Sequence, residues 1–239
     1  MSEDEKKIKR ELLLPGDIID EEDVKPGRGT FRRKGKIYAA KLGVKTLRSG
    51  YVNVAAQSGR YDPKGGDKVI GTITDVNSSI WMVDLNAPFP AVLHVNDVPW
   101  RVEFGDTISY IDVGDAVLVK VSNVDELKKI QVTMDEEGLR KLNTGQIIEI
   151  APSQVPRVIG RKGSMISMLK RYTGCRIFVG QNGRIWIDGD LEGQYTAVQA
   201  IKMIEEHAQV HGLTEAVKNF LKEETGLDLD EEEEKEKEE

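Results

Sequence analysis

Two glycines that enclose two cations, Gly160-Arg161-Lys162-Gly163, form the segment of this sequence with the clearest chemistry. Because glycine has no side chain, a sugar–phosphate backbone could approach the main chain closely at both positions. Arg161 and Lys162 add positive charge, and a helix that begins near Gly163 would point free backbone N–H groups at phosphate. These residue types suit contact with a phosphate backbone through charge and backbone N–H groups, which would not read sequence.

The elements around this loop are predicted from hydrophobic spacing and turn signals. Pro152 favours the start of a short helix that stops at the loop, and residues 164–172 resume helical spacing. The Asn182-Gly183 pair is a strong hairpin signal. In chain order we expect a strand at 146–150, two helices that flank the loop, strands at 176–179 and 184–187, and a closing helix at 191–211. The order βααββα describes an α+β domain.

Further cations of this domain lie near the loop in the sequence. Residues 151–187 contain seven Lys or Arg and no Asp or Glu, so no acid within the stretch neutralises them. Such a stretch favours binding to a polyanion. We predict that RNA is bound by the loop, the residue before it and the neighbouring cations: Arg157, Ile159, Gly160, Arg161, Lys162, Gly163, Lys170, Arg171, Arg176 and Arg184.

The charge is segregated along the chain. The net charge is −7, but residues 223–239 hold 11 acids and 2 bases, so the preceding part is +2. Residues 25–60 contain ten Lys or Arg and no acid, whereas residues 61–140 contain 14 acids and 7 bases. Segregation of this kind favours binding to a polyanion, although solvated surface lysines give a simpler reading. We expect the acidic tail to be disordered and to aid solubility, discourage non-specific RNA or bind a basic partner.

Residues 66–137 carry the strand pattern of a small barrel. Pro63, Gly65 and Gly66 break the preceding pattern, and five strand candidates follow, at 69–76, 80–85, 91–95, 116–121 and 129–133. Five strands in about 70 residues predict an OB β-barrel, which binds single strands through aromatic and basic side chains. Trp81, Phe89, His94 and Lys120 are the candidates here. A place in the barrel core explains Trp81 and Phe89 equally well.

Residues 1–65 read as a β-rich domain, with strand-like pieces at 18–19, 36–40 and 51–54 separated by glycines, and we expect a small antiparallel sheet. Its cations have two explanations, docking to an acidic protein surface or a second RNA-binding track. The candidates are Arg28, Arg32, Arg33, Lys34 and Lys36. The predicted chain is thus multidomain: a β-rich N-terminal domain (1–65), a five-stranded OB barrel (66–137), the α+β domain (138–222) and the tail (223–239).

The loop and its surroundings resemble a known family. The order βααββα and the run Val158-Ile159-Gly160-Arg161-Lys162-Gly163-Ser164 resemble the K homology (KH) RNA-binding domain, whose signature is an Ile-Gly-x-x-Gly loop between two helices. The strands at 71–76, 81–85 and 113–121 resemble the ribosomal-protein type of OB domain. With Leu13-Leu14-Pro15-Gly16-Asp17 near the start and Gly27-Arg28-Gly29-Thr30 leading to Ile37-Tyr38-Ala39, the domain order is similar to the RNA-binding cap subunits of the archaeal exosome, over about residues 10–215.

The resemblance implies partners and a role. In that family the N-terminal domain docks on a hexameric ring of RNase PH-like subunits, of a catalytic and an inactive type. Three caps surround the entry pore, and each recruits single-stranded RNA and threads its 3′ end into the ring without cleaving it. A sister cap carries a zinc ribbon and can share the ring; the single cysteine here, Cys175, argues against that identity.

The remaining residues predict no enzyme, cofactor or metal. Three histidines and one cysteine occur with no Ser-His-Asp order or Walker loop, and His207 and His211 lack a zincin pattern although they are spaced i, i+4. No apolar run approaches the roughly 20 residues of a membrane helix, and the first residues lack a signal-peptide core, so we expect a cytoplasmic protein and no membrane partner.

Two other functions remain open. A free-standing transcription or translation factor would also place an OB domain before KH domains, but bacterial factors of this kind carry two KH copies and this chain has one flanked loop. A phosphorolytic nuclease would need a larger catalytic core than this length holds beside three small domains. Bacterial polynucleotide phosphorylase also has the reverse order, KH before OB.

Overall fold

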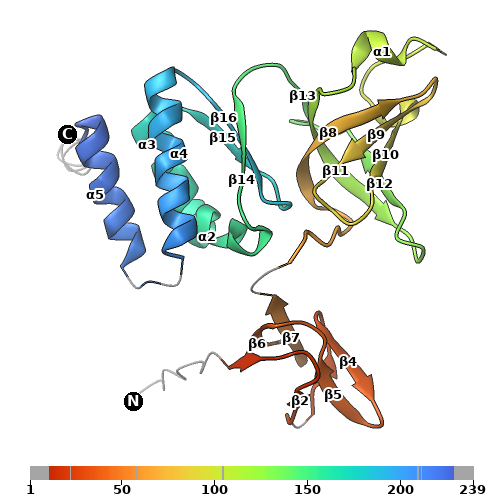
Figure 1. Ribbon diagram of the computed structural model, residues 1–239, viewed down its shortest axis with the longest axis vertical. Helices are drawn as coiled ribbons and strands as arrows, with labels where there is room; N and C mark the ends of the chain where they lie inside the picture. Colours follow the sequence, from red (N-terminus) through yellow and green to blue (C-terminus); the bar gives the residue numbers. More distant parts are fainter. Residues whose placement is uncertain are drawn as a thin grey trace. The chain divides into compact units, whose positions relative to one another are not determined.

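The computed structural model describes residues 11–21, 23–56, 59–103, 105–208, 210 and 212–228 (Figure 1). The chain forms two compact units, residues 1–59 and 60–239. The division lies before the boundary near residue 65 that the turn signals indicated. Tyr61 explains the difference, because its ring is buried in the barrel core and its O–H donates to Asp67 Oδ2 at 2.7 Å. Tyr61 therefore belongs to the barrel domain.

The N-terminal unit contains two small sheets. One has the order β1-β6-β7-β3 and the other β2-β5-β4. Their strands are β1 (Leu12–Leu13), β2 (Ile18–Ile19), β3 (Lys25–Pro26), β4 (Thr30–Arg33), β5 (Lys36–Ala39), β6 (Gly43–Arg48) and β7 (Tyr51–Ala56). The predicted β-rich domain is confirmed, but a single antiparallel sheet is wrong, because there are two sheets and β3 pairs with β7 in parallel. The core is formed by Leu13, Ile19, Ile37, Ala39, Val52 and Val54.

The second unit begins with a closed five-stranded barrel. Its strands are β8 (Lys68–Val76), β9 (Ile80–Asp84), β10 (Ala91–His94), β11 (Ala116–Val124) and β12 (Ile130–Thr133). Neighbours pair in antiparallel fashion, except that the parallel pair β10–β12 closes the barrel. The five predicted strands and the OB fold are confirmed. A sixth strand, β13 (Arg140–Leu142), pairs with β11 and leads to the next domain, and α1 (Thr107–Tyr110) precedes β11.

The KH part follows the predicted order βααββα. It contains β14 (Gln146–Glu149), α2 (Val155–Ile159), α3 (Ser164–Thr173), β15 (Arg176–Val179), β16 (Arg184–Asp188) and α4 (Leu191–Glu206). Figure 1 shows these helices on one face of the antiparallel sheet β14-β16-β15. Apolar side chains of α3 and α4 fill the core between helices and sheet, among them Leu169, Ile201 and Ile204. Strand β15 is an edge of the sheet.

One helix was missed by the sequence reasoning. Helix α5 (Leu213–Thr225) packs against α3 and α4, and it buries Leu213, Val217 and Leu221, which are four residues apart. The predicted acidic tail from residue 223 is wrong at its start, because residues 223–225 are helical. The part of the tail from residue 229 lies outside the described residues.

The barrel and the KH domain are joined by the β15–β16 hairpin. Its tip places Asn182, which is fully buried, against the barrel, where Nδ2 donates to the carbonyls of Ile70 (2.7 Å) and Leu85 (3.0 Å). The Gln181 N–H donates to the Lys68 carbonyl at 3.0 Å. Gly180 allows this approach, because a Cβ there would lie 2.5 Å from Asn182 Oδ1. The residues predicted as a hairpin turn thus also connect two domains.

We expect Asn182→Ala to lower the free energy of unfolding by about 2–4 kcal/mol, because it leaves two buried carbonyls without their donors. Urea unfolding followed by tryptophan fluorescence measures the loss. Gln181→Ala is the matched control, since Gln181 is exposed and uses only its backbone here. Equal stability of the two variants would contradict this role of Asn182.

Candidate nucleic-acid interface

The loop between α2 and α3 has a backbone that glycine makes possible. Helix α2 ends at Ile159 and is followed by Gly160 (φ +76°), Lys162 has φ +52°, and Gly163 (φ +83°) precedes α3. A Cβ at Gly160 would lie 2.7 Å from the Met165 nitrogen, so no other residue fits there. At Gly163 the nearest atom would be 3.8 Å away, so its requirement is the left-handed φ alone. The two positions therefore require glycine for different physical reasons, a close contact at Gly160 and the backbone conformation at Gly163.

The loop presents two cations to solvent. Arg161 and Lys162 are exposed, and neither forms an ion pair with any residue that the structure describes. The expectation of free N–H groups at the helix start is only partly met, because the Gly163 N–H donates to the Gly160 carbonyl at 3.3 Å and the Ser164 N–H to the Arg161 carbonyl. The loop would therefore attract a phosphate mainly through the positive charges of Arg161 and Lys162.

An apolar surface lies beside the loop. Three aliphatic side chains are half-buried here: Ile159, the last residue of α2, Ile166, in the first turn of α3, and Val179, on the edge strand β15. Partly exposed aliphatic side chains next to a cationic loop suit a nucleotide, whose base is apolar on its faces and whose phosphate is charged.

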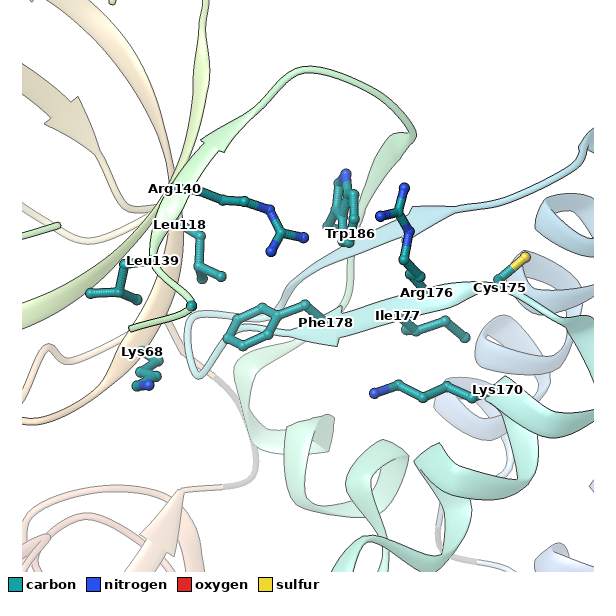
Figure 2. A pocket seen from close by; sticks show the side chains of 11 residues that line it. Lys68, Leu118, Leu139, Arg140, Lys170, Cys175, Arg176, Ile177, Phe178 and Trp186 are labelled. Atoms are coloured by element: carbon teal, nitrogen blue, oxygen red, sulfur yellow. The ribbon is translucent and has the colours of Figure 1, made fainter. Parts of the chain in front are cut away.

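The structure brings two of the predicted cations to one place. Lys170 on α3 and Arg176 at the start of β15 line the same cavity of about 390 Å³ (Figure 2). Arg176 also forms an ion pair with Asp188. The pKa of the Asp188 carboxyl is lowered from its ordinary value, first by a hydrogen bond from the Thr144 side chain and then by Arg176. Arg171 is exposed on the same helix.

Two cations of the predicted set have structural partners instead. Arg184 is wrong as an RNA ligand: it is buried, and its guanidinium pairs with Asp84 of the barrel and with Glu149 Oε1 at 2.8 Å. Its Nη1 also donates to the Asp84 carbonyl at 2.7 Å. Arg157 is half-buried, and its Nη2 donates to the Val210 carbonyl at 3.3 Å.

The barrel candidates separate by exposure. Trp81 is wrong as a stacking platform, because it is fully buried and its Nε1–H donates to the Ile111 carbonyl at 2.9 Å. Phe89 is 54% exposed, so the core reading is wrong for it. His94 Nδ1 accepts from the Asn96 N–H at 3.1 Å, and Lys120 pairs with Glu136. Phe89 is therefore the barrel candidate whose side chain remains available.

The basic residues of the N-terminal unit gather on one hairpin. The strands β4 and β5 and the turn between them carry Arg32, Arg33, Lys34 and Lys36, and Arg28 precedes them; all five are exposed. The cross-strand register places Phe31 and Tyr38 on the outer face, where their rings stack at 5.4 Å, and pairs Ile18 with Tyr38. We call this surface, formed by Ile18, Phe31, Arg33, Lys36 and Tyr38, the hairpin face.

The described residues also bear on metal binding and on membrane spanning. Within the ranges described, no three His, Cys, Asp or Glu side chains cluster as metal ligands; His211 lies outside those ranges. Among the described helices, none has the length and apolar character needed to cross a membrane.

Comparison with known proteins decides the family. Three family models match: the exosome complex exonuclease RRP4 N-terminal region at residues 12–48, the RRP4 S1 domain at residues 60–103 and the KH domain at residues 145–192. The exosome complex component Rrp4 of Methanosarcina mazei is 45% identical over 90% of this chain and 83% of its own length. This chain belongs to the Rrp4 family of exosome components.

Two further comparisons support membership in the Rrp4 family. The Rrp4 of Thermoplasma volcanium is also 45% identical, over 91% of this chain and 92% of its own. A crystal structure described as an exosome complex RNA-binding protein is 42% identical and superimposes with a TM-score of 0.65, over 70% of this chain and 97% of that one. The resemblance to the archaeal exosome cap family is thereby confirmed.

Sequence reasoning missed three residues of the cavity that Lys170 and Arg176 line. Lys68 and Arg140 come from the barrel, and Phe178 follows Arg176 on β15. Lys68 and Arg140 lie at opposite ends of the barrel sequence and far from the loop, so no local spacing connects them. Only the docking of the hairpin tip on the barrel brings them together.

We expect Gly160→Ala to lower the free energy of unfolding by about 2–4 kcal/mol, because its Cβ would overlap the α3 backbone. Gly163→Ala should cost about 1–2 kcal/mol, the penalty of a left-handed residue without a clash. Urea unfolding of the two variants provides the comparison. Equal losses would show that the contact with Met165 is not the constraint at Gly160.

Proposed function

We propose that this chain is a non-catalytic RNA-binding subunit that caps the RNase PH-like ring of the exosome and feeds single-stranded RNA into it for 3′→5′ phosphorolytic degradation. The observation that carries the proposal is the loop at Gly160–Gly163, where two exposed cations, with no acidic partner among the described residues, lie beside a half-buried apolar surface. Membership in the Rrp4 family supports the setting in the exosome.

Recognition would proceed through charge and shape. Arg161 and Lys162 attract the phosphates, and the absence of side chains at the two glycines lets the sugar–phosphate backbone approach. The apolar surface of Ile159, Ile166 and Val179 then receives the bases. None of these contacts distinguishes one base from another, which suits a subunit that must accept many RNAs.

Ring docking falls to the N-terminal unit. Its hairpin face combines an apolar centre with Arg33 and Lys36, and such a mixture of aromatic and cationic side chains is typical of protein interfaces. We propose three copies per ring, alone or mixed with the zinc-ribbon cap protein, in the cytoplasm. Cleavage then belongs to the ring. The absence of a nucleophile-and-base arrangement in the sequence supports a non-catalytic role for this chain.

We expect Gly163→Asp to weaken binding of single-stranded RNA at least tenfold, because the carboxylate would oppose phosphate inside the loop. Gly163→Asn is the matched control: it has nearly the same shape and tolerates the left-handed φ equally well, but it is neutral. Fluorescence anisotropy with a labelled oligoribonucleotide measures both affinities. If both folded variants bind the oligoribonucleotide with the affinity of the wild-type protein, the loop is not the RNA site.

We expect replacement of Arg32, Arg33 and Lys34 by Ala to weaken docking on the purified ring most at low salt and less at higher salt, where the wild-type contact is itself screened, because the contact is partly electrostatic. Mass photometry of the protein mixed with the ring counts the bound copies. Anisotropy with RNA alone should give the wild-type affinity. Loss of RNA binding with unchanged docking would instead assign this hairpin to a second RNA-binding track.

A further inference from the structure

A cavity of about 390 Å³ lies where the barrel meets the KH domain. The barrel contributes Lys68 on β8 and Arg140 on β13, and the KH domain contributes Lys170, Arg176 and Phe178 (Figure 2). Four of the residues that line it are Lys or Arg, and none is Asp or Glu. We call this cavity the interdomain cleft.

One tryptophan holds two of the cations in place. Trp186 is nearly fully buried, and its Nε1–H donates to the Thr144 carbonyl at 2.6 Å, which fixes the ring. The guanidinium carbons of Arg140 and Arg176 lie 5.2 Å and 5.8 Å from its centroid. Figure 2 shows the indole between the two guanidinium groups. The tryptophan is therefore not free to stack on a base; it positions two cations from different domains.

The charge in the interdomain cleft is only partly compensated, by Asp188, which pairs with Arg176 and also attracts Arg140. Arg176 pairs with Asp188, but its side chain remains 72% exposed. Within the described part of the chain, Lys68, Arg140 and Lys170 form no ion pair. Like charges that converge on one cavity repel each other, and an anion relieves that repulsion.

The position of the cleft points to a continuing strand. Lys170 on α3 lies seven residues after Gly163, the residue that precedes this helix, which is about 10 Å along the helix axis at 1.5 Å per residue. A strand whose phosphates are held at the loop therefore reaches the cleft within a few nucleotides. At the cleft, half-buried Phe178 offers a ring on which a base can stack.

We infer that the interdomain cleft binds the next nucleotides of the single-stranded RNA held at the KH loop, with Lys68, Arg140, Lys170 and Arg176 on its phosphates and Phe178 on a base. The inference rests on the proposed RNA-binding function. It makes the joint between the two domains part of the RNA path, so that a strand passes from the KH domain to the barrel without leaving the protein surface.

The test removes the two barrel cations, Lys68→Ala with Arg140→Ala, in the full chain. A KH loop alone holds about four nucleotides, so labelled RNAs of about 5 and about 12 nucleotides separate the two sites. We expect the double variant to bind the longer RNA about tenfold more weakly, with a salt slope smaller by about 1.4, and the shorter RNA as the wild-type protein does. Lys68→Ala alone, which leaves the contact of Arg140 with Trp186 intact, should give a part of the loss.

The control removes the same charge elsewhere. Lys128 and Lys129 are exposed in the turn between β11 and β12, which Figure 1 shows on the side of the barrel away from the KH helices. Their double Ala variant should bind both RNAs normally. If both double variants bind the longer RNA equally, the interdomain cleft is not on the RNA path. That result would not affect the assignment of RNA binding to the KH loop, because Gly163→Asp tests the loop separately with the shorter RNA.

Discussion

The buried amide of Asn182 is the contact on which the arrangement of the second unit depends. It joins the tip of a KH hairpin to the carbonyls of Ile70 and Leu85 in the barrel. The ion pairs of Arg184 with Asp84 and Glu149 support the same joint from the next strand. Because a buried amide without partners is costly, this contact is specific as well as stabilising. It explains why barrel and KH domain form one compact unit rather than two tethered modules.

The electrostatic pattern follows from this joint. Cations that the joint uses, such as Arg184, are buried and paired, whereas those at Arg161, Lys162 and Lys170 remain exposed. The joint also closes one side of the interdomain cleft, since Phe178 and Trp186 pack against the barrel core. The docking of the hairpin tip on the barrel therefore determines which cations are buried in the joint and which remain exposed for RNA. It also brings the exposed cations onto a common surface.

Most of the fold could be predicted because its signals are local. The glycine loop, the Asn-Gly turn and the five short strands each depend on residues close in sequence. Trp81 and Arg184 were misassigned because sequence gives residue type and not burial: an aromatic residue in a strand suits a core and a binding face equally. Lys68 and Arg140 were missed because their proximity to Lys170 arises only from the contact between domains. Helix α5 was missed because the acidic composition beyond residue 222 obscured its apolar spacing of four.

We propose that single-stranded RNA runs over the KH loop and onto the barrel of this one chain. The most direct measurement is ultraviolet crosslinking of a bound oligoribonucleotide, followed by mass spectrometry of the crosslinked peptides. We expect crosslinks in the peptides that contain the loop at 160–163 and the cleft residue Phe178. Crosslinks confined to the N-terminal unit, or an absence of crosslinks from the KH domain, would contradict it.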